Sequence, residues 1–385
     1  MRFAESLSRP GFGAIAEFKR RSPSAGDISP AAQVEDVVLA YETGGARAIS
    51  ILVDAAFAGS LDDLRAARAA TSVPLLAKGF FSNEEHLRDL REAGADAALL
   101  ILRDLDDATA VRLIAAADHL GLDTLVEAHD ADELGRATRL DARVIGVNAR
   151  DLGTFRIDRG AQLELVAKTP RDRLVIAESA IHTRAQAAAA ELAGADAVLV
   201  GTSLMRAHEP GAKLRELLSR PLVKVCGLTQ QEDVDAAVEA GADFCGFIFA
   251  EGSPRKAADV LPVPDSVLSV AVFVGDPEER GTDLTQVYAR EEGKVRGRDA
   301  VLLRDGEQVA RVADLPWDED DPDHWRTARR DDDRLMLAGR LGPDNVRAAI
   351  RAVQPWAVDA ASQLESAPGI KDHEKVRTFV QEARA

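Results

Sequence analysis

The stretch Ala16-Glu17-Phe18-Lys19-Arg20-Arg21-Ser22-Pro23-Ser24 places a carboxylate and an ammonium group two residues apart at the end of an apolar run. Residues two apart on a β-strand share a face. Burying that face is costly because unpaired charges lose their hydration. The Ser-Pro-Ser that follows ends the strand and opens a loop. Charged groups at the C-terminal end of a barrel strand usually belong to an active site. The alternative is a purely structural Glu–Lys pair.

Apolar, strand-like runs recur through the first half at a spacing of roughly 25 residues. Between them lie stretches rich in Ala, Leu, Glu and Arg, which favour helices. Ala-Gly-Ala-Asp at 93–96, 193–196 and 240–243 marks places where a helix ends on Gly and a strand begins. Strands alternating with helices in this way predict an α/β fold, a parallel (β/α)8 or TIM barrel. The runs are Ala14–Lys19, Ala46–Asp54, Pro74–Lys78, Ala97–Leu102, Thr124–Glu127, Val144–Asn148, Leu174–Glu178 and Ala197–Gly201.

Several of these runs end on a polar residue, which favours a barrel over an open sheet because the strand ends of a barrel converge. The endings resemble the indole-3-glycerol phosphate synthase family over residues 12 to 216. The resemblance implies ring closure of carboxyphenylamino-deoxyribulose phosphate to indole-glycerol phosphate, with loss of carbon dioxide and water. The matching segments are Ala16–Ser24, Leu75–Phe80, Leu125–His129, Gly146–Leu152, Ala177–Ile181 and Leu199–Met205.

Closing the ring requires a proton donor near the ketone oxygen, and a lysine whose pKa is lowered by its site could supply the proton. Lys78 matches the family's catalytic lysine and is expected to be this acid. Lys19 is expected either to pair with the substrate carboxylate or to serve in the dehydration, so the division of labour between the two lysines stays open. Glu127 is expected to be the base that removes the last proton. The alternative for Glu127 is a surface carboxylate.

The remaining residues of this predicted site hold the lysines, the substrate and its phosphate. Glu17 and Glu178 are expected to orient the lysines and the substrate hydroxyls. Backbone N–H groups in the loops after strands seven and eight are expected to bind the phosphate. The predicted substrate-binding residues are Ser22, Phe80, Asn148, Arg150, Glu178, Ser179, Ala180, Gly201 and Thr202.

The first half departs from the family pattern in three places. The family usually carries a longer N-terminal segment, expected here to be missing or reduced to Met1–Ser8. Gly79 stands where the family has Asp after the catalytic lysine, and Ala180 stands where it has Gly. We expect these changes to affect substrate closure and affinity more than the reaction type.

A domain boundary is predicted near Ser219-Arg220-Pro221, giving domains 1–219 and 222–385. The second half resembles the phosphoribosylanthranilate isomerase family. This resemblance implies a second barrel and an Amadori rearrangement that makes the substrate of the first half. The matching segments are Lys224–Thr229, Ala240–Asp243, Gly246–Phe249, Ser253–Arg255, Val358–Ser362 and Pro368–Asp372.

An Amadori rearrangement needs an acid to open the sugar ring and a base to remove the C2 proton. A thiol near its pKa can be that base, and Cys226 ends its strand where the family's cysteine does. The alternative is that Cys226 is a small buried apolar residue. Asp314 is the expected acid, and Arg255 is expected to contact the anthranilate carboxylate of the substrate.

The middle of the second half fits the family poorly. Residues 274–333 are short for strands four to six with their helices, so the second barrel is predicted to be shortened or irregular there. Gln-Val-Tyr at 286–288 stands where Gln-Leu-His is usual, and the acidic loop Leu315–Asp323 replaces a Gly-rich one. Ala338-Gly339-Arg340 replaces a small-residue phosphate turn, and the Arg charge could compensate. The alternative is a noncatalytic structural or regulatory module on a single-activity synthase.

The composition of the chain agrees with a cytoplasmic enzyme. The chain has 385 residues and a net charge of −17, which argues against nucleic acid or an anionic membrane as a partner. Two cysteines form no disulfide pattern. No signal peptide or apolar run of membrane length is apparent. We therefore expect a cytoplasmic enzyme acting on phosphorylated small molecules, without metal or organic cofactor. Its oligomeric state stays open, and a monomer fits.

An alternative function is that of a phosphosugar barrel enzyme of another pathway. The combination of Glu17, Lys19, Lys78 and Glu127 argues against it.

Overall fold

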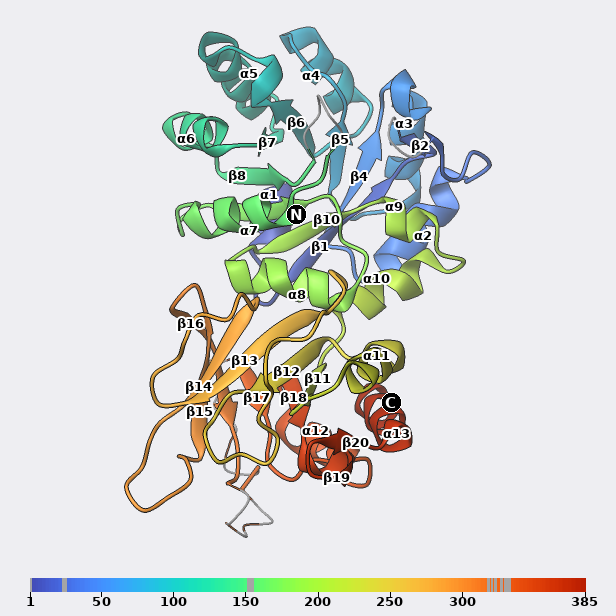
Figure 1. Cartoon of the computed structure of the whole chain (residues 1–385). Coiled ribbons are helices and arrows are strands. Elements are labelled where there is room, and N and C mark those ends of the chain that lie inside the picture. Colours follow the sequence, from blue (N-terminus) through green and yellow to red (C-terminus); the bar gives the residue numbers. More distant parts are fainter. Residues whose placement is uncertain are drawn as a thin grey trace. The chain divides into compact units, whose positions relative to one another are not determined.

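The structure is a computed structural model that describes residues 2–22, 26–150, 156–316, 319, 321, 324–325, 328 and 334–385. The chain divides into two compact units (Figure 1). The first consists of Met1–His182 with Ala187–Leu218, and the second of Thr183–Gln186 with Ser219–Ala385. Among the described residues, no helix has the length and apolar character needed to cross a membrane.

Within the described ranges, eight parallel strands of the first unit close into a barrel in the order β1-β10-β9-β8-β7-β6-β5-β4. Each strand coincides with one of the apolar runs, so the predicted barrel is confirmed. The strands are β1 Gly13–Phe18, β4 Ala48–Leu52, β5 Leu75–Lys78, β6 Ala97–Ile101, β7 Asp123–Ala128, β8 Val144–Asn148, β9 Leu174–Glu178 and β10 Ala197–Val200. A short hairpin, β2 Arg21–Ser22 with β3 Gly26–Asp27, follows β1.

Helices connect these strands, and several begin on a residue whose side chain caps the first turn, such as Asn83, Asp106 and Asp130. The helices are α1 Phe3–Leu7, α2 Val34–Thr43, α3 Leu61–Ala70, α4 Glu84–Glu92, α5 Asp107–His119, α6 Ala131–Arg139, α7 Arg159–Lys168, α8 Arg184–Ala193, α9 Thr202–Met205 and α10 Pro210–Leu218, with 3-10 turns η1 Ala55–Phe57 and η2 Leu102–Asp104.

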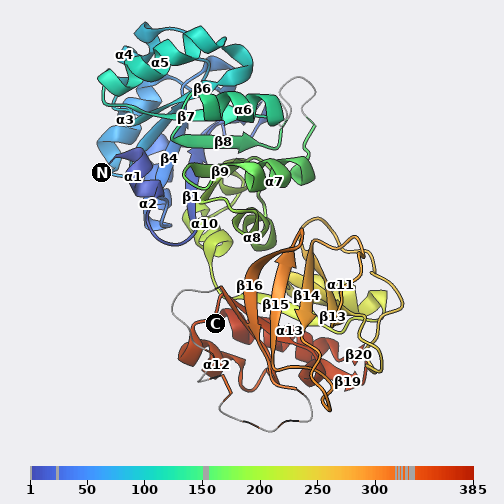
Figure 2. The same ribbon diagram turned by 90° about the vertical axis from the view of Figure 1, so that its left-hand side faces the viewer.

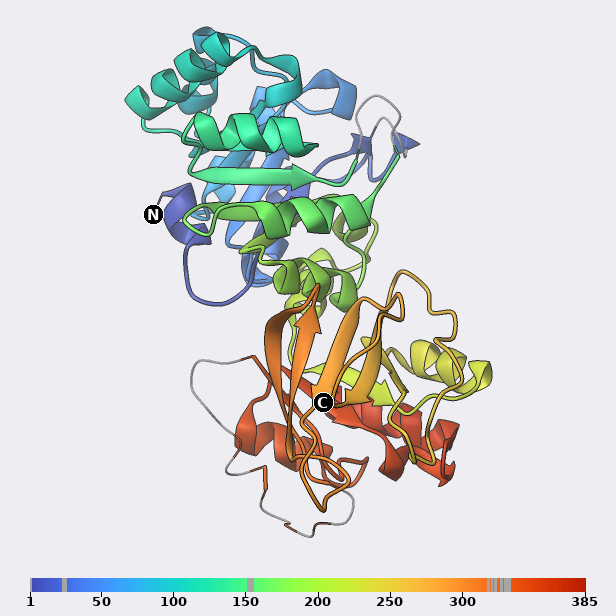
Figure 3. The ribbon, with the colours of Figure 1, turned by 60° about the vertical axis from the view of Figure 1, so that its left-hand side comes forward.

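The short helix α1 covers the end of the first barrel at which its strands begin. Figures 2 and 3 show α1 at the end opposite the arrowheads. Its Phe3, Ala4 and Leu7 are buried in one apolar cluster with interior residues of the barrel such as Ile15 and Leu125. The N-terminal end of the barrel is thus filled by apolar side chains, and the polar chemistry is left to the other end.

Eight strands of the second unit, again within the described ranges, also close into a barrel, in the sequential order β11 to β18. They are β11 Leu222–Cys226, β12 Phe244–Ile248, β13 Leu268–Val274, β14 Leu284–Tyr288, β15 Asp299–Arg304, β16 Glu307–Ala313, β17 Leu335–Leu337 and β18 Ala357–Ala360. The helices are α11 Gln231–Ala240, α12 Val346–Val353 and α13 His373–Arg384, with the 3-10 turn η3 Ser362–Leu364 and the hairpin β19 Glu365–Ala367 with β20 Ile370–Lys371.

The second barrel is irregular in its middle, as the sequence predicts. Strand β15 runs antiparallel to both β14 and β16, whereas the other neighbouring strands are parallel. Among the described residues no helix lies between β12 and β17 in the chain. Figure 2 shows β14, β15 and β16 side by side. A tight turn at Asp305-Gly306 replaces a helical crossover, because antiparallel neighbours need no long connection.

Candidate active sites

The charged residues of the first barrel lie on its interior face because of strand periodicity. In four strands the residue two positions earlier is a buried apolar residue of the barrel interior. The pairs are Ile15 and Glu17, Leu76 and Lys78, Leu125 and Glu127, and Ile176 and Glu178. The charged member is always the nearer to the C-terminal end of its strand. The sequence therefore builds an apolar layer inside the barrel and a charged layer above it.

Lys78 is the centre of this charged layer. Its Nζ lies 2.5 Å from Glu178 Oε2, 3.4 Å from Glu127 Oε2 and 3.8 Å from Glu17 Oε2. Lys19 Nζ lies 2.5 Å from the other oxygen of Glu17. The three carboxylate side chains are at most 5% exposed. The structure thus brings five charged residues together at the C-terminal ends of β1, β5, β7 and β9, namely Glu17, Lys19, Lys78, Glu127 and Glu178.

The three carboxyl groups differ in protonation. Burial acts to raise the pKa of Glu17, but Lys19 and Lys78 outweigh burial and hold it below its ordinary value. Burial likewise opposes ionisation of Glu127, yet Lys78, His129 and Asn148 hold its pKa below its ordinary value. For Glu178 burial prevails and raises the pKa to about 8. Environments that separate the pKa values of neighbouring carboxyl groups are typical of acid–base sites.

The expectation that the site lowers the pKa of its lysine is wrong for Lys78 in the free protein. Burial does act to lower it, but the charges of Glu178, Glu127 and Glu17 prevail and raise the pKa of Lys78. Lys78 therefore carries its proton at neutral pH, which a proton donor must do.

His129 is a residue of this site whose role the sequence analysis missed. Its Nε2 lies 3.1 Å from Glu127 Oε1 and its Nδ1 lies 3.0 Å from Glu133 Oε2. Burial opposes the charged imidazole, but the neighbouring carboxylates of Glu127 and Glu133 prevail and raise the pKa of His129 to about 9. Asn148 Nδ2 donates to Glu127 Oε1 at 3.2 Å. The available signal was the i, i+2 spacing of Glu127, on β7, and His129, which directly follows that strand.

The other predicted residues of the first half lie in the segments that follow the barrel strands. Ser22 is in the hairpin after β1, and Phe80, which is half exposed, follows β5 and stacks on Phe57. Arg150 follows β8, and its backbone N–H donates to Asn148 Oδ1. Ser179 and Ala180 after β9 both have positive φ, and Gly201-Thr202 follow β10 at the start of α9.

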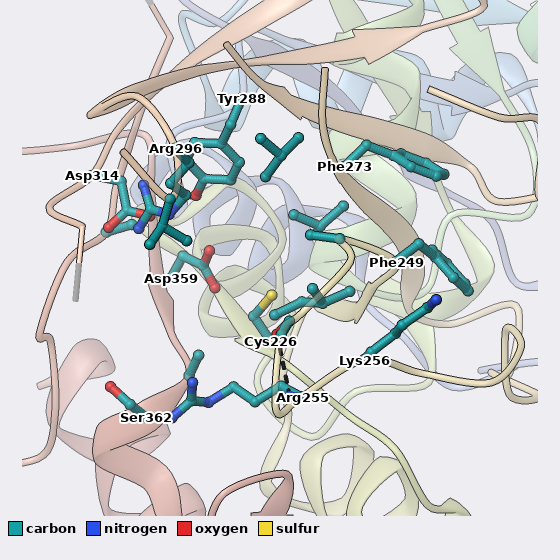
Figure 4. Close-up of a pocket in the computed structure, with 18 of the residues that line it drawn as sticks. Cys226, Phe249, Arg255, Lys256, Phe273, Tyr288, Arg296, Asp314, Asp359 and Ser362 are labelled. Carbon is teal, nitrogen blue, oxygen red and sulfur yellow. Dashed lines mark hydrogen bonds and ion pairs between the residues drawn. The ribbon is translucent and has the colours of Figure 1, made fainter. Parts of the chain in front are cut away.

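The second barrel contains a cavity of about 1120 Å³ at the C-terminal ends of its parallel strands. Cys226, Arg255 and Asp314, the three residues predicted from the sequence, all line it (Figure 4). Asp359 and Tyr288 line it as well. Figure 4 shows Asp314, Tyr288 and Arg296 gathered on one side, with Cys226 and Asp359 between them and Arg255.

Cys226 lies beside a buried ion pair. Lys224, two residues earlier on β11, is fully buried, and its Nζ donates to Asp359 Oδ2 at 2.8 Å. Burial raises the pKa of the Cys226 thiol, and the opposing charge of Lys224 only limits the rise. The expectation of a thiol near its pKa is therefore wrong for the free protein, which holds Cys226 in its protonated form.

Asp314 follows β16 and is fixed by several donors. Tyr288 Oη donates to Asp314 Oδ2 at 2.5 Å, and Arg296 Nη2 donates to the same oxygen at 2.7 Å. Burial raises the pKa of Asp314 above its ordinary value, although Arg296 and Tyr288 act against the rise. A raised pKa suits a carboxyl group that must hold a proton before donating it.

Arg255 has a protein partner in this structure. Its Nε and Nη2 donate to the two oxygens of Glu365 at 2.8 and 2.9 Å, and Lys371 Nζ donates to Glu365 Oε1 at 3.0 Å. This bidentate pair fixes the plane of the guanidinium. It uses Nε and Nη2, so Nη1 is the nitrogen that remains for a ligand.

A protonated lysine lies beside ionised carboxylates at the C-terminal end of a closed β/α barrel. This combination defines an acid–base enzyme of the barrel class. Residues 1–217 match the family model described as indole-3-glycerol phosphate synthase, and residues 322–382 match that of N-(5'phosphoribosyl)anthranilate (PRA) isomerase. The chain belongs to the indole-3-glycerol phosphate synthase family, because the first match covers more than half of its length.

Individual proteins give the same assignment for the first half. The chain is 43% identical over 215 residues to the indole-3-glycerol phosphate synthase of Mycobacterium ulcerans, an alignment that covers 56% of this chain and 79% of that protein. It is 42% identical over 217 residues to indole-3-glycerol phosphate synthase 2 of Streptomyces coelicolor, covering 56% and 84%.

A crystal structure of phosphoribosyl anthranilate isomerase from Thermotoga maritima is 27% identical, with a TM-score of 0.34, and covers 43% of this chain and 99% of that one. With the isomerase family model in the C-terminal region, the chain combines a synthase and an isomerase of tryptophan biosynthesis.

Proposed function

We propose that Lys78 is the general acid of ring closure and that Glu127 is the base that removes the last proton. The observation that carries this assignment is the contact of Lys78 Nζ with three buried carboxylates at the C-terminal end of the barrel. Lys78 is charged and Glu127 is ionised at neutral pH, which are the states that a donor and an acceptor require.

In this proposal the other charged groups position the reactants. Lys19, held by Glu17, binds the substrate carboxylate until it leaves as carbon dioxide or assists the loss of water. Glu178 orients Lys78 by accepting a hydrogen bond from its Nζ. Asn148 holds Glu127, and Arg150 lines the substrate site with Phe80.

The phosphate of the substrate is proposed to bind the backbone N–H groups that follow β9 and β10. The segments concerned are Ser179-Ala180 and Gly201-Thr202, with Ser22 as an extra contact. Two consecutive residues with positive φ at 179 and 180 turn the backbone sharply there, which supports a concave arrangement of N–H groups.

For the second barrel we propose that Asp314 donates a proton to the ring oxygen of phosphoribosylanthranilate, which opens the sugar ring. The Cys226 thiol releases its proton to solvent, and the resulting thiolate then removes the C2 proton. Arg255 binds the anthranilate carboxylate through its Nη1 edge. The support is that all three side chains line one cavity, in a barrel whose middle is otherwise irregular.

We place the two activities on residues 1–219 and 222–385, and the enzyme in the cytoplasm without nucleic-acid or membrane partners. The free, buried thiols of Cys226 and Cys245 and the net charge of −17 support this location.

One experiment tests both proposed sites. The purified full chain is supplied with phosphoribosylanthranilate generated in situ, and every product is quantified over time. Indole-glycerol phosphate is expected to accumulate, because its formation requires both activities. If only anthranilate from breakdown of the substrate appears, the isomerase proposal fails, and the synthase is then assayed with carboxyphenylamino-deoxyribulose phosphate directly.

A further inference from the structure

The Asp314 carboxylate is bound unevenly on its two oxygens. Oδ2 accepts hydrogen bonds from both Tyr288 and Arg296, whereas Oδ1 accepts one from the backbone N–H of Leu315, at 2.7 Å. Since a carboxylate oxygen offers about two lone-pair sites, Oδ2 is fully used and Oδ1 keeps one site for a proton. The Arg296 guanidinium also lies over the ring of Tyr288, 4.2 Å from its centroid, so the two donors support each other.

The Tyr288 hydroxyl is oriented by a buried chain of donors. It accepts from Gln286 Nε2 at 2.7 Å, and Gln286 Oε1 accepts from Lys224 Nζ at 3.0 Å. Every donor in this series points the same way, from Lys224 toward Asp314. Hydrogen bonds aligned in this way polarise one another and strengthen the last one in the chain. Gln286 and Lys224 are fully buried, so the alignment is shielded from water.

We propose that Tyr288 and Arg296 are positioning residues of the isomerase: they occupy Oδ2 of Asp314 and leave Oδ1 to carry the transferred proton into the cavity. The inference rests on the proposed role of Asp314 as the acid. Both residues come from the irregular middle of the barrel, Tyr288 from the end of β14 and Arg296 from the segment 289–298 before the reversed β15. The irregular segment thus completes the site.

The charged and titratable groups facing Asp314 set the expected pH behaviour. They are, among the described residues, Tyr288 on β14, Arg296 from the 289–298 segment and Asp359 on β18, with Lys224 on β11 next to Asp359. Burial raises the pKa of Asp314, Arg296 and Tyr288 lower it, and the charge of Asp359 adds to the rise. Removing either donor should therefore raise the pKa of Asp314 further.

The test compares Tyr288→Phe, Arg296→Gln and Asp314→Asn in the full chain. Isomerase kcat and kcat/KM are measured from pH 6 to 9, and ring closure is measured separately with carboxyphenylamino-deoxyribulose phosphate. For Tyr288→Phe and Arg296→Gln we expect kcat to fall by about 10-fold and the alkaline limb of kcat/KM to move up by about one pH unit. Ring closure should stay at the parent rate, because it reports the other barrel.

Tyr41→Phe is the matched control, since it removes the hydroxyl of the chain's other tyrosine, which lies in the first barrel. Its isomerase profile should match the parent. If Asp314→Asn keeps the parent isomerase rate, the proposed acid is wrong. If Asp314→Asn is inactive while Tyr288→Phe and Arg296→Gln keep the alkaline limb of the parent, the acid stands and the inference is overturned. A fall in rate without movement of the limb also overturns it, because packing alone would explain that result.

Discussion

Gly146→Ala should damage the synthase by displacing Glu178. Gly146 is on β8, in the barrel interior next to β9. A Cβ at this position would lie 2.0 Å from Glu178 Oε1 and 3.2 Å from its Cδ. Ordinary contact requires about 3.5 Å, so the carboxylate would have to move by roughly 1.5 Å. Glu178 is fully buried, and its partner Lys78 lies 2.5 Å away, so this displacement breaks their pair.

The expected kinetic effect is a loss of about 100-fold in kcat, which is typical when a reacting group is misplaced by about 1 Å. The effect on stability is smaller. Alanine in a strand gains about 0.5–1 kcal/mol over glycine, whereas forced overpacking costs about 1–3 kcal/mol. We therefore expect the free energy of unfolding to fall by about 1–2 kcal/mol.

Ring closure is assayed by formation of indole-glycerol phosphate, and unfolding by urea titration followed through the tryptophans. All three tryptophans lie in the second half of the chain, so far-ultraviolet circular dichroism, which reports both barrels, is recorded in the same titration. A transition that dichroism shows and the tryptophans do not is assigned to the first barrel. Gly135→Ala is the matched control: it lies in α6, where an added Cβ is 3.4 Å from the flexible end of Arg139. It should keep full activity and gain about 1 kcal/mol. Parent-level kcat in Gly146→Ala would refute the reasoning.

Three further substitutions probe the two sites. Lys78→Met should reduce ring closure by about 10²- to 10⁴-fold and leave isomerisation intact; equal loss of both activities would mean global damage instead. Cys226→Ala should abolish isomerisation and spare ring closure, and an unchanged isomerase rate would favour a noncatalytic second half. His129→Gln tests the pH dependence of stability. The pKa of His129 is raised to about 9 in the folded state from 6.5, so its stabilisation is complete below pH 6.5 and is lost as the pH rises to 9. The parent should lose about 3 kcal/mol more than His129→Gln over this window. Parallel stability curves would contradict the assignment.

Strand periodicity explains why much of the first site could be predicted. Glu17, Lys78, Glu127 and Glu178 each lie at or near the C-terminal end of an apolar run, and parallel strands bring such ends to one edge of a barrel. The protonation of these groups could not be predicted in the same way. The pKa of Lys78 depends on three carboxylates from other strands, and the sum of their charges against burial is set by distances that the sequence does not give.

The reversed direction of strand β15 was not predicted, although the sequence contains a local signal for it. Asp305-Gly306 lies between two β-like runs, and both residues have positive φ, at 50° and 82°. An Asp-Gly pair between such runs is a strong hairpin signal. The resemblance to the isomerase family implies helical connections there instead. The contact of Arg296 with Asp314, in contrast, depends on the path of the 289–298 segment, which has no periodic pattern to predict it.

Both barrels make room for side chains of the proposed sites in the same way, by a glycine on or directly after the neighbouring strand. Glu178 on β9 leans over Gly146 of the neighbouring β8, and Glu17 on β1 leans over Gly201 after the neighbouring β10, where a Cβ would lie 2.2 Å from Glu17 Oε1. In the second barrel Gly246 on β12 pairs with Cys226 on β11, and a Cβ there would lie 2.8 Å from the sulfur. Side chains just fill the interior of an eight-stranded barrel. A long side chain can therefore extend over the adjacent strand only where the residue on that strand has no side chain. These glycines are thus part of the proposed sites. Gly201→Ala should impair ring closure and leave isomerisation unchanged, whereas Gly246→Ala should impair isomerisation and leave ring closure unchanged.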